Sequence, residues 1–262
     1  MDRRARTELR AAGFPRFFVI SGFRINAYRV FLWVGLYVGI ITTALMAKGA
    51  GESAWRMGLA TLSIVVVGLI GARVYYLATS CAPRTRKAFW VEALRTSTGE
   101  GGASVLGALV VLPFSILPAR WAGVPVAAFW DYLIIGVCFG AAFVRFGCIC
   151  NGCCGGRESH GWFAVTQHDV HGVSKPRKPV QWIEIASWLI GGVVLLSHWH
   201  RHSKPGSYAL SGLAWYGCIR FCLEPWREEP DPRARRAKIN RIVAGLLALG
   251  AGGGLLILAW RD

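Results

Sequence analysis

The stretch VPVAAFWDYLIIGVCFGAAFVRF, from Val124 to Phe146, is the strongest indication of the fold class. A helix needs about 20 mostly apolar residues to cross the hydrocarbon core of a bilayer. This stretch reaches that length, and its only charged residues are Asp131 and Arg145. It therefore predicts a membrane-spanning helix that holds charged groups inside the bilayer.

Six further stretches of the chain have a similar apolar character. They are Ala27–Ala47, Met57–Ala78, Ala103–Ala122, Val180–His198, Tyr208–Leu223 and Arg241–Trp260. Pro113 and Pro118 interrupt one of them, and Arg220 interrupts another. The connections are short and rich in proline, glycine and charge, and none shows the amphipathic periodicity of a soluble domain.

These spans predict an all-α integral membrane protein with about seven transmembrane helices and a short loop-rich active-site region. Residues 27–262 are expected to form a single helical transmembrane domain. Residues 1–26 form a basic N-terminal flank. The hydrophobic run after this flank is too long for a cleavable signal peptide, so we expect the flank to lie at the membrane surface.

The composition narrows the class of protein further. The chain has 262 residues, of which 54% are hydrophobic and 17% charged, and its formal net charge is +16. This balance excludes a disordered chain, a collagen, a coiled coil and a small disulfide scaffold. No basic stripe is interleaved with aromatic residues, so we expect no nucleic-acid partner.

Several charged residues fall inside or beside the predicted spans. They are Arg73, Asp131, Arg145 and Arg220, with Glu224 one turn beyond the last. Charges inside a membrane are costly and commonly mark functional sites, although each could also belong to a structural ion pair. The arginines outnumber the acids, so an anionic ligand such as a phospholipid headgroup would offset the excess, because guanidinium groups match phosphate geometry.

The sixth span carries three of the candidate residues at helical spacing. Tyr216, Arg220 and Glu224 follow one another at four-residue intervals. Side chains at this spacing project from one face of a helix. Such a face could hold a phosphate while the glutamate orients the guanidinium, or it could be a structural ion pair.

Cysteines crowd the connection after the fourth span. Cys148, Cys150, Cys153 and Cys154 lie close together, and His160 follows. The Cys150-x-x-Cys153 spacing suits a metal ligand pair, but a closed zinc site needs a second pair, for which Cys218 and Cys222 are a distant option. We expect no metal or other cofactor, and interpret these cysteines as small buried apolar residues in a glycine-rich turn.

The same segment carries the pattern R-x-G-x-x-x-N-G-x-x-x-G-R, which resembles the signature of the prolipoprotein diacylglyceryl transferases. Its residues are Arg145, Gly147, Asn151, Gly152, Gly156 and Arg157. Other pieces resemble the family in the same order. They are Asp131 fourteen residues before Arg145, Gly71-Ala-Arg73-Val-Tyr75, Pro179-Val-Gln181-Trp-Ile-Glu184 and Tyr216-Gly217-x-x-Arg220-x-x-x-Glu224.

This resemblance implies a seven-helix enzyme of the inner membrane. Such an enzyme moves the diacylglyceryl group of phosphatidylglycerol onto the lipobox cysteine thiol of a prolipoprotein and releases glycerol phosphate. By resemblance, Arg145 and Arg220 would clamp the lipid phosphate, while Tyr216 and Glu224 would complete the catalytic set. The substrate-binding residues would be Arg73, Asp131, Gly147, Asn151, Gly152, Gly156, Arg157, Gln181 and Glu184.

The chain also departs from the family pattern. Leu106 stands where the family has a third-helix histidine, and Lys178 replaces a second histidine. Cys148 replaces an asparagine, and Cys153 replaces an acidic residue. A thiol acceptor with a pKa of about 8.5 needs help to become a thiolate, and leucine cannot take its proton. Two alternatives therefore stay open: a non-catalytic phospholipid-binding paralogue, and a metal or redox membrane protein that uses the cysteine cluster.

The distribution of basic residues bears on orientation. With seven spans, 21 Lys and Arg residues lie on the side of the N-terminal flank and 6 on the opposite side. The positive-inside rule then places the N-terminus in the cytoplasm. The resemblance implies the opposite, with the N-terminus and the active-site loops outside.

Overall fold

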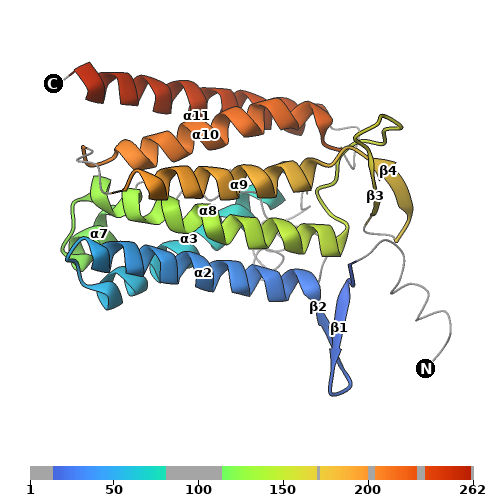
Figure 1. The fold of residues 1–262 in the computed structure, drawn as a ribbon, viewed down its shortest axis with the longest axis horizontal. Helices are drawn as coiled ribbons and strands as arrows, with labels where there is room; N and C mark the ends of the chain where they lie inside the picture. Colours follow the sequence, from blue (N-terminus) through green and yellow to red (C-terminus); the bar gives the residue numbers. More distant parts are fainter. Residues whose placement is uncertain (1–13, 81–113, 170–171, 200–203, 229–233, 261–262) are drawn as a thin grey trace.

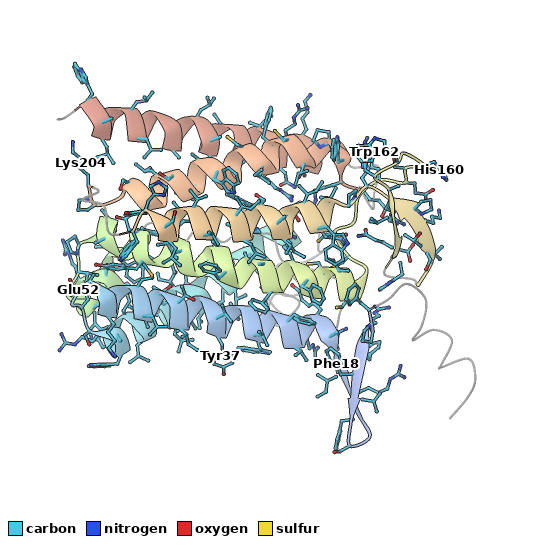
Figure 2. The ribbon with its side chains drawn as sticks, viewed as in Figure 1. Phe18, Tyr37, Glu52, His160, Trp162 and Lys204 are labelled. Carbon is cyan, nitrogen blue, oxygen red and sulfur yellow. The ribbon has the colours of Figure 1, made fainter. Side chains whose placement is uncertain are left out.

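The computed structural model describes residues 14–80, 114–169, 172–199, 204–228 and 234–260. Long helices lie side by side along one axis, with two short hairpins at one end (Figure 1). We call this the hairpin end, and the other the far end. Figure 2 shows His160 and Trp162 at the hairpin end, and Glu52 and Lys204 at the far end.

The described chain is mostly helical. Its helices are α2 (Ala27–Gly49), α3 (Ala54–Ser80), α7 (Ile116–Ala122), α8 (Val126–Asn151), α9 (Val180–Ser197), α10 (Ser207–Leu223) and α11 (Ala234–Trp260), with a short 3-10 helix η1 (Glu224–Trp226). The strands are β1 (Phe17–Ile20), β2 (Phe23–Asn26), β3 (Val165–His168) and β4 (Ser174–Arg177). Each hairpin is antiparallel, with β1 paired to β2 and β3 paired to β4.

The prediction of about seven transmembrane helices is not confirmed. Among the described residues, five helices are long and apolar enough to cross a membrane, in α2, α3, α8, α9 and α11. α10 has 17 residues and contains Arg220, so it falls short of that length. Of the predicted span Ala103–Ala122, α7 forms the final part, and residues up to 113 lie outside the described ranges. The chain is a multi-pass membrane protein with helices of unequal length.

The two hairpins correct the expectation of a purely helical chain. In the basic flank, β1 and β2 are joined by Ser21 and Gly22, which have φ values of 49° and 84°. Positive φ at both central residues suits the tight turn of a two-residue hairpin. The apolar and aromatic residues on each side of Ser21-Gly22 were the local signal for this hairpin, and the basic residues of the flank masked it.

α8 is the centre of the bundle. It packs against α2, α7, α9 and α10. In its most apolar window 61% of the residues are buried, compared with 11% in α11. The helix expected to span the bilayer from Val124 to Phe146 therefore faces other helices more than lipid, and it can carry charged side chains into their midst.

Close packing of α2 against α8 depends on two facing pairs of glycines. Gly35 and Gly39 of α2 lie against Gly140 and Gly136 of α8, each pair separated by three residues. A Cβ atom on Gly140 would lie 2.5 Å from the carbonyl oxygen of Gly35. Small residues at this spacing let membrane helices approach until their backbones touch.

Candidate active site

A group of charged side chains gathers at the hairpin end, where α8 and α10 end and α9 begins. We call Arg145, Glu184, Arg220, Glu224 and Arg227 the arginine cluster. Glu184 Oε2 lies 3.1 Å from Arg145 Nε, while Glu184 Oε1 accepts hydrogen bonds from Arg220 Nη1 at 3.3 Å and Arg227 Nη1 at 3.0 Å. Segments far apart in the sequence thus share one carboxylate.

The second carboxylate of the cluster holds one of the arginines from the other side. Glu224 Oε2 lies 2.9 Å from Arg220 Nη2. Glu224 Oε1 accepts a hydrogen bond from Asn240 Nδ2 of α11 at 3.2 Å. Arg220 is therefore held between Glu184 and Glu224, which fixes the plane of its guanidinium group.

The arginine cluster is buried and carries excess positive charge. The arginine side chains are between 11% and 13% exposed, and that of Glu184 is 4% exposed. Three guanidinium groups against two carboxylates leave a formal charge of +1. Buried ions are costly unless they are paired and hydrogen-bonded, so this excess favours an anionic group beside the cluster.

Sequence reasoning missed Arg227, which had been counted among the basic residues of a connection. It lies directly after η1, three residues beyond Glu224 and seven beyond Arg220. That near-helical spacing was the available signal. Burial opposes the charge of Arg227, but the neighbouring Glu184 carboxylate outweighs it and raises the pKa of the Arg227 guanidinium.

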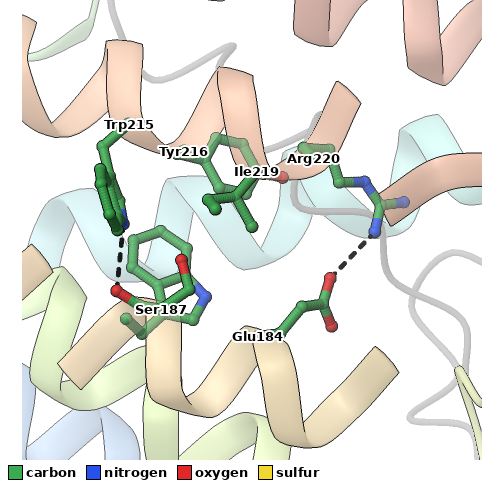
Figure 3. Close-up of a pocket in the computed structure, with 7 residues that line it drawn as sticks. Glu184, Ser187, Trp215, Tyr216, Ile219 and Arg220 are labelled. Atoms are coloured by element: carbon green, nitrogen blue, oxygen red, sulfur yellow. Dashed lines mark hydrogen bonds and ion pairs between the residues drawn. The ribbon is translucent and has the colours of Figure 1, made fainter. Parts of the chain in front are cut away.

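A small hollow adjoins the cluster between α9 and α10 (Figure 3). It has a volume of about 10 Å³ and is lined by residues that include Glu184, Tyr216 and Arg220. The Tyr216 ring stacks on Trp188 with their centroids 5.2 Å apart, and Trp215 Nε1 donates to the Ser187 carbonyl at 3.0 Å. Aromatic rings thus form the wall that separates the charges from the apolar part of the bundle.

Four buried polar atoms in and beside the cluster make no hydrogen bond among the described residues. Glu184 Oε2 and Glu224 Oε2 still face arginines in ion pairs, whereas Arg220 Nε and Gln181 Oε1 have no such contact. Buried polar groups are nearly always paired in folded proteins. The free Arg220 N–H in particular is a donor that an anionic oxygen can fill.

The turn after α8 brings the signature residues to the cluster. α8 ends in a Schellman motif, in which Gly152 N–H donates to the Ile149 carbonyl and Cys153 N–H to the Cys148 carbonyl. Gly152 has φ = 70°, and a side chain there would overlap the backbone of Asp169. Glycine at this position lets the chain reverse and run back beside Arg227.

Three thiols meet in this turn. The Sγ atoms of Cys148, Cys153 and Cys154, which we call the thiol triad, all lie within 4.8 Å of one another. Cys154 reaches solvent on one side, while on the other it interacts electrostatically with Arg145, Glu184 and Arg227. Contacts with the Cys148 and Cys153 thiols, followed by the charges of Arg227 and Arg145, lower the pKa of the Cys154 thiol well below its usual value.

The family model described as prolipoprotein diacylglyceryl transferase matches residues 15–258. The chain belongs to that family. A Lactobacillus johnsonii protein named phosphatidylglycerol–prolipoprotein diacylglyceryl transferase is 24% identical over 255 residues, which covers 87% of this chain and 86% of that protein. A Prochlorococcus marinus protein of the same name is 29% identical over 154 residues, or 53% of this chain and 50% of its own length.

A mycobacterial relative gives the same result over most of the chain. The Mycobacterium tuberculosis protein of that name is 27% identical over 262 residues, covering 87% of this chain and 53% of the relative. The chain therefore spans about half the length of this relative. At such identities, the chemistry of this family member has to be argued from its own residues.

The structure brings most of the predicted site residues of this transferase-family chain together. Arg145, Glu184, Arg220 and Glu224 form the cluster, and Tyr216 lies beside them. The remaining neighbours act through backbone contacts. Arg157 Nε donates to the Arg227 carbonyl at 3.1 Å, Gln181 Nε2 donates to the Cys153 carbonyl at 2.8 Å, and Gly156 packs against Lys178 and pairs with Arg227.

Two signature residues lie between α8 and α2 in this family member. A side chain on Gly147 would meet Phe31 Cβ at 2.9 Å, so this glycine permits close helix packing. Asn151 is buried, and its Oδ1 accepts a hydrogen bond from Asn26 Nδ2 at 3.4 Å. Asn26 in turn caps α2, so Asn151 ties the end of α8 to the start of α2.

Asp131 is not part of the arginine cluster. It lies about 21 Å from Arg145 along α8, at a rise of 1.5 Å per residue. Its carboxylate accepts hydrogen bonds from Gly206 N–H at 2.6 Å and Ala209 N–H at 2.8 Å. This places the predicted substrate-binding aspartate at the far end, where it holds the first turn of α10.

The remaining predictions fall outside what the structure describes. Arg73 lies in α3, but its side chain is not among the described ones. Leu106 lies in residues 81–113, outside the described ranges.

Proposed function

We propose that this chain transfers the diacylglyceryl group of phosphatidylglycerol to the lipobox cysteine thiol of a prolipoprotein, as a multi-pass protein of the inner membrane. The observation that carries the proposal is the buried arginine cluster. It lies on the residues that make the chain a family member, at the end of the helices where a lipid headgroup would sit. The relatives' names specify the same reaction for those proteins.

The charge of the arginine cluster suits the phosphodiester of the donor lipid. A phosphodiester carries one negative charge, which balances the formal charge of +1 on the cluster. Arg220 Nε, which has no partner among the described residues, supplies a free donor. Glu184 holds three guanidinium groups in place before the lipid binds, so little reorganisation is needed.

Transfer itself increases the negative charge on the phosphate. The thiolate sulfur attacks the glyceryl carbon, a carbon–sulfur bond forms, and the carbon–oxygen bond to phosphate breaks. The bonding pair leaves with glycerol phosphate, which becomes a dianion, while the proton of the acceptor thiol goes to solvent. Fixed guanidinium donors stabilise this developing charge more than that of the bound lipid, which lowers the barrier.

Substitution of the cluster arginines tests the proposal. We expect Arg220→Ala and Arg227→Ala to lower kcat about 100- to 1000-fold, the loss typical of a removed oxyanion donor. Arg227→Lys should recover part of the activity, because it keeps the charge but loses the fork of donors. The assay follows the mass increase of a lipobox peptide incubated with purified full-length protein and phosphatidylglycerol.

Arg56→Ala is the matched control, because Arg56 is exposed at the start of α3 and stacks on Trp55 at the far end. Its activity should equal that of the wild type. Wild-type protein that retains phosphatidylglycerol but forms no thioether would instead support a non-catalytic phospholipid-binding paralogue.

A further inference from the structure

The thiol triad is built like a metal site. A tetrahedral zinc ion with Zn–S bonds of about 2.3 Å holds its sulfur ligands about 3.8 Å apart. The three Sγ atoms already lie within 4.8 Å of one another, so small side-chain rotations would bring them to that spacing.

The backbone fixes the three cysteines independently of any ion. Cys148 lies in the last turn of α8, and the Schellman hydrogen bond of 3.1 Å from Cys153 N–H to the Cys148 carbonyl folds Cys153 over it. Gln181 Nε2 holds the Cys153 carbonyl from α9 at 2.8 Å. Cys154 has φ = 61°, a left-handed conformation that is unfavourable for a non-glycine residue, so the surrounding fold holds this cysteine in place against a local cost.

The number and type of ligands point to zinc with an open position. Catalytic zinc sites use three protein ligands and leave the fourth position for water or substrate, whereas structural sites are closed by four. Thiolates favour zinc over magnesium or calcium. In the described part of the chain, no fourth His, Cys, Asp or Glu joins the triad.

The positive charge beside the triad favours thiolates. Three thiolates around Zn²⁺ carry a formal charge of −1 next to a cluster of +1, and with the donor phosphodiester bound the three groups sum to −1. Cys154 interacts electrostatically with both Arg145 and Arg227, so the triad lies within the field of the arginine cluster.

The transfer step needs a thiolate, and the described carboxylates of the cluster are poorly placed to generate one. Glu184 is bound by three arginines, and Glu224 by Arg220 and Asn240. A thiol that coordinates zinc is deprotonated by the metal. A zinc ion in the triad would therefore generate the acceptor thiolate without the help of a protein base.

We propose that Cys148, Cys153 and Cys154 bind one zinc ion whose fourth position takes the acceptor thiol of the prolipoprotein, an inference that rests on the proposed function. The acceptor thiol displaces zinc-bound water and releases its proton to solvent. Its sulfur then forms the bond to the glyceryl carbon as the carbon–oxygen bond to phosphate breaks. The thioether product is a weaker ligand, and water replaces it. No electron transfer is involved.

Metal binding is tested on purified full-length protein without reference to turnover. We expect one zinc per chain by elemental analysis. Replacement by Co²⁺ should give thiolate-to-cobalt charge-transfer absorption and the intense visible bands of a tetrahedral site. A lipobox peptide should shift those visible bands, whereas the same peptide with serine in place of cysteine should not.

The variants separate a metal site from simple packing. Cys154→Ser changes an exposed residue and should lower the zinc content at least tenfold without loss of folded protein; Cys148→Ala and Cys153→Ala should do the same. Cys150→Ala is the control, because Cys150 is buried on the same turn of α8 but lies outside the triad, and it should keep its zinc. If the three thiols serve only to pack the turn after α8, wild-type protein will contain no zinc and show no cobalt bands. That result overturns the inference.

Activity then distinguishes the two proposals. With the zinc site present, removing zinc should slow transfer about 100-fold, within the range of a lost general base, and added Zn²⁺ should restore it. Undiminished transfer by the zinc-free Cys154→Ser variant would overturn the zinc inference and leave the proposed function standing. Zinc and a peptide-dependent cobalt spectrum without any transfer would support the site and contradict the proposed function.

Discussion

At the scale of single residues, Glu184 is the organising group of the site. One carboxylate binds guanidinium groups from α8, from α10 and from the segment after η1. The sequence predicted the P-x-Q-x-x-E element that contains it, but not that one glutamate would serve three arginines. That arrangement depends on where three chain segments end in space.

Neutralising this carboxylate should damage both stability and activity. Glu184→Gln removes the shared counter-charge and leaves three buried guanidinium groups facing one carboxylate. Breaking a buried ion pair in this way costs about 3–5 kcal/mol. We expect a lower melting temperature in detergent and transfer reduced about 100-fold, as for a lost transition-state contact.

Glu158→Gln is the control at the same end of the molecule. Its exposed carboxylate pairs with Lys175, whose hydrogen bond lowers the pKa of Glu158. Because the pKa is lowered, this pair stabilises the folded protein near neutral pH, and that stabilisation is lost as the pH falls through the folded-state pKa. Near neutral pH the control should melt and react like the wild type, and a Glu184→Gln protein that does the same would contradict the role given to Glu184.

At the scale of elements, the contact of α2 with α8 positions Arg145 and the turn that follows it. The facing glycines set the distance between these helices, and neither composition nor span length reveals which helices pair. The sequence indicated both spans with nearly correct boundaries, since apolar length is a local property. The structure shows that these two helices pair, because their backbones touch at the facing glycines.

A methyl group at this crossing should force the helices apart. In Gly136→Ala the new Cβ would overlap Thr43 Oγ1 and the Gly39 carbonyl. Overpacking of this kind costs about 1–3 kcal/mol, so we expect a lower melting temperature in detergent and weaker transfer through displacement of Arg145.

Gly250→Ala is a matched change in α11, where nothing lies within 4 Å of the added Cβ. It should melt at or above the wild-type temperature, because alanine favours a helix over glycine. Equal melting temperatures for the two variants would show that the α2–α8 crossing tolerates more volume than the structure implies.

At the scale of the whole molecule, several of the basic residues counted on the hairpin side have partners within the protein. Between residues 157 and 178, Lys175 pairs with Glu158, Arg177 with Glu228, and Lys178 stacks on Trp226. Arg227 is buried in the cluster. Setting these four residues aside still leaves 17 basic residues on the hairpin side against 6 on the far side, so the positive-inside count and the topology implied by the resemblance continue to disagree.

Following the family's orientation, we expect the hairpin end to face outward and the far end, where α11 finishes, to face the cytoplasm (Figure 1). A green fluorescent protein fused to the C-terminus should fluoresce, and an alkaline phosphatase fusion at the same place should be inactive. The reverse pattern would place the active-site loops in the cytoplasm. The same two reporters fused after residue 50 or residue 123, both at the far end, provide the internal check and should give the same pattern as the C-terminal fusions.

Apolar length and motifs were enough to predict that the chain enters a membrane, that it belongs to this family and that Arg145 and Arg220 are candidate site residues. Both signals are read along the chain. The positions of Arg227 in the cluster, of Asp131 at the first turn of α10 and of three cysteines in one turn became known from the packing of the helices. Those outcomes depend on where helices cross and end, because a buried charge or backbone group takes whichever partner the packing brings within reach.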